Sequence, residues 1–236
     1  MKAKGISICA ALLTGLLFLN DPLFAAVESD IVGYTTITME AGKWYQVGVP
    51  FEQLNGATSY NISEVFSKGF SDGDMLFVMD PTTCAYPVVR KWRTVNGTSG
   101  WGKVAIPKLE DATIDAGEAV LINKKTTGDV TFIGKVNSLA KSVISGDNAW
   151  SLVALQYPTE VAINSLKWSG IENNDMLFVM DPELCTYITV RKWRTVNGTS
   201  GWGKVAIPKL EDLTLTPGQA VLINKKSSGT ATVSFE

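Results

Sequence analysis

The chain has 236 residues, of which 45% are hydrophobic and 19% charged, and its formal net charge is −2 at pH 7. This composition can supply a buried core and excludes a wholly disordered chain. The slightly negative charge gives no electrostatic basis for nucleic-acid binding. Because the sequence contains no histidine, His-based catalytic triads and the usual proton shuttle near neutral pH are excluded.

The N-terminal residues 1–25 have the pattern of a secretory signal peptide. Lys2 and Lys4 precede an apolar stretch over residues 6–19, and the small residues Ala25 and Ala26 offer a cleavage site. The stretch is shorter than the roughly 20 apolar residues of a membrane-spanning helix. We therefore expect a secreted or cell-surface protein without a transmembrane segment in the mature chain.

Downstream, residue types typical of strands alternate in short runs that Gly, Asn, Asp and Pro interrupt. In the first half these runs predict strands over Ile31–Met39, Trp44–Val49, Met75–Met79, Val88–Val95, Thr98–Ile106, Ala119–Ile122 and Val130–Ile133. The continuous apolar run 75–79 indicates a central strand that is buried on both faces. A helical turn or two is expected only over residues 63–68 and over their counterparts 164–168.

Asn96-Gly97 lies between two alternating runs and is the preferred residue pair for a two-residue type I′ hairpin. Counting outward from this turn places Trp92 opposite Trp101, at a closer, non-hydrogen-bonded site of the ladder. Arg90 and Lys103 come next on the same face. The turn therefore predicts both the register of the hairpin and a cross-strand Trp pair.

The second half of the chain repeats the first at an offset of 101 residues. Residues 75–81 recur as 176–182, residues 89–111 recur without a change as 190–212, and residues 119–125 recur as 220–226. Upstream, Trp44 corresponds to Trp150 once a short deletion is allowed. The repeat predicts an all-β protein of two tandem β-sandwich or barrel-like domains, residues 26–135 and 136–236.

The paired Trp residues leave two interpretations open. Flanked by cations, they resemble a platform on which a sugar ring stacks while the charged groups bind its hydroxyls. Alternatively, each pair faces the core and staples its hairpin. The candidate ligand-binding residues are Trp92, Trp101, Arg90 and Lys103 in the first half and Trp193, Trp202, Arg191 and Lys204 in the second.

Cys84 and Cys185 occupy equivalent positions, three residues after a proline in each half. Because an exported protein can keep its disulfides, a bond between these two residues would link the halves. Buried free thiols and a bond between two chains are the alternatives that the sequence leaves open.

Two acidic turns, residues 71–74 and 172–175, carry oxygen ligands of the kind that calcium prefers. Their spacing matches no calcium-binding loop, and a turn before the following strand explains them, so we predict no metal and no cofactor. Asp80, Glu110 and Asp111 are of the type that glycosidases use. No element places such a pair in distinct environments, so a secreted hydrolase is the least favoured function and we expect no enzyme.

Several motifs recur in a fixed order: Gly33-Tyr34, Gly42-Lys43-Trp44, the Asp72-Gly73-Asp74 turn, the Trp hairpin, and the Ala-Gly-Glu-Ala-Val-Leu-Ile segment of residues 116–122. This order resembles an uncharacterised exported all-β tandem repeat of predicted surface and secreted proteins of Gram-negative bacteria. The resemblance covers nearly the whole mature chain and implies no activity. The second half departs from it at its start, where residues 135–137 read Lys-Val-Asn.

Together these features favour an exported, non-catalytic structural or cell-surface protein. An extracellular carbohydrate-binding or adhesion module that uses the paired Trp residues is the alternative. The expected partners are extracellular glycans or other surface proteins. Self-assembly is also expected, because an exposed edge strand can template pairing with another chain.

Overall fold

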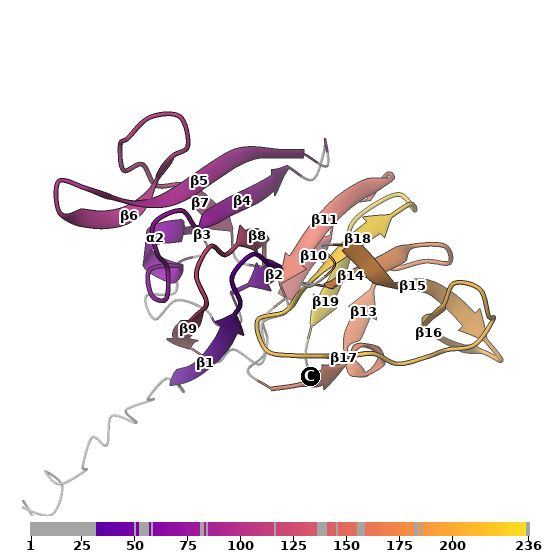
Figure 1. The fold of residues 1–236 in the computed structure, drawn as a ribbon. Helices are drawn as coiled ribbons and strands as arrows, with labels where there is room; N and C mark the ends of the chain where they lie inside the picture. The colour runs from indigo at the N-terminus through magenta and orange to yellow at the C-terminus, as the bar shows by residue number, and fades with distance from the viewer. Residues whose placement is uncertain are drawn as a thin grey trace, which may run out of the picture. The chain divides into compact units, whose positions relative to one another are not determined.

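The computed structural model describes residues 32–49, 51, 57, 59–80, 83, 85–115, 117–135, 141–144, 146–154, 159–181, 184 and 186–234. Across these residues the protein is an assembly of antiparallel sheets, which confirms the predicted all-β class (Figure 1). The predicted signal peptide, Cys84 and Cys185 lie outside the described residues. No helix within the described part of the chain is long and apolar enough to cross a membrane.

The first half, residues 32–135, contains nine strands in its described part, with one short helix among them. They are β1 (Val32–Met39), β2 (Trp44–Gly48), β3 (Ser59–Asn61), α2 (Ile62–Val65), β4 (Met75–Asp80), β5 (Ala85–Val95), β6 (Thr98–Lys103), β7 (Thr113–Asp115), β8 (Ala119–Asn123) and β9 (Gly128–Lys135).

The second half, residues 141–234, follows the same order with one strand added. Its elements are β10 (Lys141–Ile144), β11 (Ala149–Ala154), β12 (Val161–Ala162), η1 (Ile163–Ser165), β13 (Lys167–Ser169), β14 (Met176–Asp181), β15 (Thr186–Val196), β16 (Thr199–Lys204), β17 (Thr214–Leu215), β18 (Ala220–Lys225) and β19 (Ala231–Ser234).

Each half is organised around a five-stranded antiparallel sheet. The strand order is β2-β8-β4-β5-β6 in the first half and β11-β18-β14-β15-β16 in the second, and these strands correspond one to one along the chain. Smaller pairings complete each half: β1-β9 and β3-β7 in the first, β10-β19-β13 and β12-β17 in the second. The run 75–79 is a central strand, as predicted, because β4 lies between β8 and β5. Its predicted burial on both faces is only partial, since Leu76 and Met79 are buried and the other side chains of the run are half-buried.

The predicted helical turn over residues 63–68 is present as α2, although it ends at Val65, and the one predicted over residues 164–168 is confirmed only in its first part. A single 3₁₀ turn, η1, is followed at once by strand β13, which pairs with β19. Trp168 gives the physical reason, because its ring packs against those of Trp193 and Trp202 at centroid distances of 6.5 and 5.2 Å. The extended backbone of β13 thus places this ring in the aromatic cluster of the second half.

The two faces of each five-stranded sheet are buried against different partners. One face of the first sheet covers a core that belongs to the first half, with Leu76 and Ile122 fully buried, and the second half has an equivalent core around Leu177 and Ile223. The opposite faces contribute to a third cluster drawn from both halves, which contains Met79, Ala119, Leu152, Ala154, Ala220 and Leu222. We call this third cluster the shared layer.

The outer edge of β2 is covered by the second half. Val47 forms an isolated antiparallel bridge with Gln219, and the Gly48 amide donates to the Gly218 carbonyl at 3.0 Å. These bonds satisfy backbone groups that an edge strand otherwise leaves unpaired. The segment before β18 therefore closes the edge of the first sheet.

The edge of β11 is covered by the first half in the same way. Val153 bridges Glu118, and the Ala154 amide donates to the Gly117 carbonyl at 2.9 Å. These four residues are the counterparts of Val47, Gln219, Gly48 and Gly218, so equivalent bonds run in both directions. Residues 31–236 accordingly form one compact unit. We call this region of mutual contact the joint.

At the centre of the joint, two equivalent positions touch each other. A Cβ atom built onto Gly48 would lie 2.2 Å from the Ala154 Cβ and 2.6 Å from its Cα. Contacts below 3.0 Å require the backbone to shift, so glycine is needed here for close approach and not for a special φ angle.

We predict that Gly48→Ala lowers the free energy of unfolding by about 1–3 kcal/mol, the usual cost of overpacking a rigid contact. Denaturant unfolding measures the change. Gly100→Ala is the matched control, because its Cβ would meet only Leu109 methyl groups at an ordinary 3.7 Å. Equal stability of the two variants would contradict the close contact at the joint.

Candidate functional site

Both Asn-Gly turns form hairpins with the predicted register. Trp92 pairs with Trp101 and Arg90 with Lys103 across β5 and β6, and the second half repeats these pairs. The turn residues have the positive φ angles of a type I′ turn, 50° at Asn96 and 80° at Gly97. Local turn chemistry is therefore sufficient to fix the register of these strands.

The structure places the Trp pairs against the core. Trp101 is 2% exposed and Trp92 is 8% exposed, and their rings meet edge to face at a centroid distance of 5.2 Å. The Trp101 Nε1 donates a hydrogen bond to the Phe66 carbonyl at 2.7 Å, and Phe70 packs on both rings. This pair therefore lacks the open ring face on which a sugar would stack.

In the second half, Trp202 is fully buried and Trp193 is partly buried. Their rings meet at the same 5.2 Å distance, and Trp168 takes the place that Phe70 has in the first half. Trp193 also borders a surface hollow whose rim includes Asn174 and Arg194. The ring packing is therefore alike in the two halves, but the Trp202 Nε1 has no hydrogen-bond partner among the described residues, unlike the Trp101 Nε1.

The four predicted cations form ion pairs with a carboxylate that follows each hairpin. Arg90 and Lys103 approach Glu110 at 3.4 and 3.0 Å. The hydrogen bond from Lys103 holds the pKa of Glu110 below its usual value, with further lowering by the charge of Arg90. In the second half, Arg191 and Lys204 contact Glu211 in the same manner, at 3.2 and 3.0 Å.

A different arginine in each half, which was not among the predicted site residues, binds the segment that leaves the hairpin. Arg93 donates from its two terminal nitrogens to the carbonyls of Ile106, Lys103 and Val104, at 2.8, 2.5 and 3.2 Å. Arg194 binds the equivalent carbonyls at the same distances. The strand predicted to reach Ile106 ends at Lys103 for this reason, because the chain turns back over the guanidinium.

Aliphatic side chains project from these segments, residues 104–108 and 205–209, which we call the clamped loops. Val104, Ile106, Val205 and Ile207 are between 47% and 53% exposed. Each loop also folds back on its edge strand, since Gly102 bridges Leu109 and Gly203 bridges Leu210. Each half therefore presents two half-exposed aliphatic side chains on a loop whose carbonyls are bound by an arginine.

Asp74 and Lys124 form a fully buried ion pair with an N–O distance of 2.5 Å. The Asp74 carboxylate also accepts the amides of Ser71 and Lys125, and the ammonium lies 4.8 Å from the centre of the Phe70 ring. In the second half, Asp175 has equivalent roles and lies 3.9 Å from Lys225. The acidic turns considered as calcium sites therefore bind a lysine of their own chain, and no cluster of metal-ligating residues occurs among the described residues.

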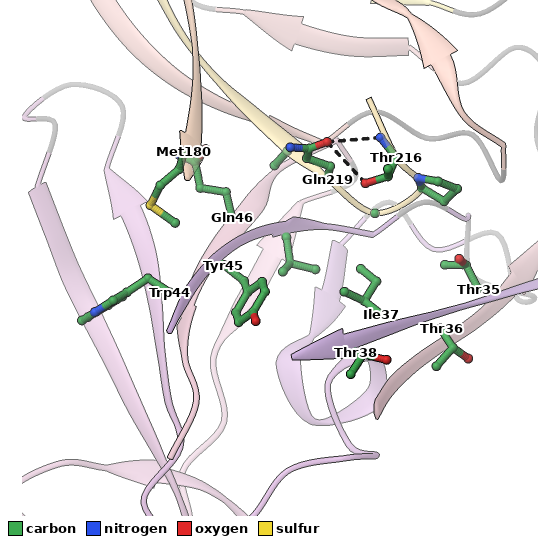
Figure 2. Close-up of a pocket in the computed structure, with 14 residues that line it drawn as sticks. Thr35, Thr36, Ile37, Thr38, Trp44, Tyr45, Gln46, Met180, Thr216 and Gln219 are labelled. Carbon is green, nitrogen blue, oxygen red and sulfur yellow. Dashed lines mark hydrogen bonds between the residues drawn. The ribbon is translucent and has the colours of Figure 1, made fainter. Parts of the chain in front are cut away.

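A cavity of about 370 Å³ lies at the joint, between β1 and β2 of the first half and the turn before β18. Figure 2 shows Ile37 and Tyr45 on the first-half strands and Thr216 and Gln219 on the turn. Sequence reasoning missed this site because its walls come from opposite halves of the chain. We call it the joint cavity.

Next to the joint, Glu118 is a partly buried carboxylate. Desolvation raises its pKa above the usual value, and this effect exceeds the lowering by the hydrogen bond from the Asp115 amide. The equivalent residue of the second half, Gln219, accepts the Thr216 amide at 3.1 Å without carrying a charge. Equivalent positions of the two halves thus carry a carboxylate, Glu118, and an uncharged amide, Gln219.

Comparison of the chain with protein-family models, with curated proteins and with solved structures gave no match.

We predict that Glu118→Gln makes the protein more stable near pH 7. Because the folded state holds the Glu118 proton more tightly than the unfolded state, stability is lost as pH rises from about 4 through the raised pKa. The glutamine amide does not titrate, so the variant avoids this loss. Its free energy of unfolding, measured in urea, should exceed that of the parent by an amount that grows from about pH 4 to pH 7. The reverse change in the second half, Gln219→Glu, should make stability fall with rising pH in the same way. If the stability of parent and E118Q depended on pH in parallel, the raised pKa of Glu118 would be refuted.

Proposed function

We propose that this chain is an exported, non-catalytic structural protein of the cell surface or the extracellular space, and that it assembles with copies of itself. The observation that carries the proposal is the pair of identical clamped loops, each with two half-exposed aliphatic side chains on a backbone fixed by arginine. Export is supported by the signal-like pattern of residues 1–25.

The exposed aliphatic side chains of the clamped loops are well suited to association between proteins. Exposed aliphatic groups gain free energy when a partner covers them, at roughly 25 cal/mol per Å² of apolar surface. Because Arg93 and Arg194 already fix the loop backbones, association costs little conformational entropy. The loops therefore act as preorganised contacts.

A second copy of the chain is the partner that we propose. Identical loops on two chains can meet in a self-complementary contact of the kind found in symmetric dimers. Without the predicted signal peptide, which holds Lys2, Lys4 and Asp21, the formal net charge changes from −2 to −3, which leaves little electrostatic repulsion between copies. Because each chain carries two loops, one contact leaves a second loop available for the next chain, and avidity can exceed the affinity of one contact.

The test replaces all four aliphatic side chains by serine: Val104→Ser, Ile106→Ser, Val205→Ser and Ile207→Ser. Because these side chains are exposed, the variant should fold like the parent. Sedimentation velocity over a wide range of concentrations should show self-association of the parent, weakened about tenfold or more in the variant, which is about 1.4 kcal/mol or more.

Tyr34→Ser with Ile133→Ser is the matched control, because these residues are cross-strand neighbours with exposed side chains elsewhere in the first half. The control should associate like the parent. A parent that stays monomeric at every concentration, or a loop variant that associates as strongly as the parent, would overturn the proposal.

A further inference from the structure

The joint cavity has the size and the walls of a small-molecule site. Its volume of about 370 Å³ lies within the range of ligand pockets, roughly 300–1,000 Å³. Ile37, Val47, Met180 and Pro217 contribute apolar walls. Trp44 and Tyr45 contribute ring surface (Figure 2). The described residues that line it include no Asp, Glu, Lys or Arg, so an uncharged ligand fits it best.

Gln46 supplies a polar atom that the folded chain leaves unused. Its side chain lines the cavity and is only 6% exposed, and its Nε2 donates to the Tyr187 hydroxyl at 2.7 Å. Its Oε1 is buried and accepts no hydrogen bond from the described residues. A buried acceptor without a donor costs roughly 1–3 kcal/mol, so folded proteins rarely retain one without a reason.

The repeat shows that folding alone does not require this amide. The position equivalent to Gln46 in the second half is Leu152, which is buried in the shared layer. An apolar side chain therefore packs at this place in the same strand of the same sheet. Leu152 fills this position by packing alone, whereas Gln46 brings a hydrogen-bond acceptor that has no donor among the described residues.

The other glutamine in the wall differs, because its acceptor is already used. The Gln219 Oε1 accepts from the Thr216 amide at 3.1 Å and from the Thr216 hydroxyl at 3.3 Å, as Figure 2 shows. These bonds hold the turn that closes one side of the cavity. The Gln46 Oε1 is thus the acceptor to which a bound molecule can add a bond.

We propose that the joint cavity binds a small, uncharged, mostly apolar ring compound that donates one hydrogen bond to the Gln46 Oε1, such as an aromatic alcohol. The rings fill the apolar walls, and the hydroxyl supplies the missing donor. The site needs both halves of one chain and none of the clamped-loop residues, so it is independent of self-assembly.

The test uses 2-naphthol and its O-methyl ether, which has nearly the same shape but no donor. Isothermal titration calorimetry should show saturable one-to-one binding of 2-naphthol, with the ether at least fivefold weaker. Methyl signals of Ile37 and Val47 in NMR spectra should shift on titration, while those of Ile133, which is exposed on β9 and does not line the cavity, should not.

Gln46→Leu is the decisive variant, because leucine occupies the equivalent position of the second half. It should fold with thermal stability equal to or above that of the parent and bind 2-naphthol at least fivefold more weakly. The difference between 2-naphthol and its ether should then disappear. No saturable binding to the parent, shifts outside the cavity, or unchanged discrimination in Q46L would each overturn the proposal.

Discussion

The two halves of this protein depend on a reciprocal closure of their sheet edges. Each five-stranded sheet has one edge strand, β2 or β11, whose outer backbone groups are bonded by the turn before the last sheet strand of the other half. The close approach of Gly48 to Ala154 lets the shared layer pack behind these bonds. The joint cavity lies between the same elements, so the only ligand site that we propose exists because of this closure.

Within each half, a buried ion pair also holds neighbouring strands of the sheet together. Asp74 binds Lys124 at the end of β8, and its carbonyl accepts the Trp92 amide on β5, so one residue links three neighbouring strands. Removing one partner of a buried pair is costly because the other charge remains without compensation. Further out, Arg93 and Arg194 fix the clamped loops by binding carbonyls. Polar side chains thus stabilise strand ends and loops while apolar residues fill the layers.

Local rules in the sequence were enough to predict the hairpins and the central strand. Asn96-Gly97 determined the pairing of Trp92 with Trp101, because a two-residue turn leaves one register. Features that depend on distant residues were not predictable: the short β3-β7 pairing, and β13, which depends on where Trp168 finds its ring partners. The burial of the Trp pairs was one of the two interpretations that the sequence left open, and the hairpin alone could not decide between them. The joint cavity was also missed, since Gln46 meets its partner Tyr187 only across the joint.

The central claim is that the halves fold as one unit through the joint. Calorimetry combined with hydrogen exchange of Asp74→Asn tests it most directly, because this change weakens contacts confined to the first half by about 3–5 kcal/mol. We expect one unfolding transition at a lowered temperature, with protection of backbone amides from exchange lost in β18 as well as in β8. Two resolved transitions, with β18 protected as in the parent, would show that the halves unfold independently and would contradict it.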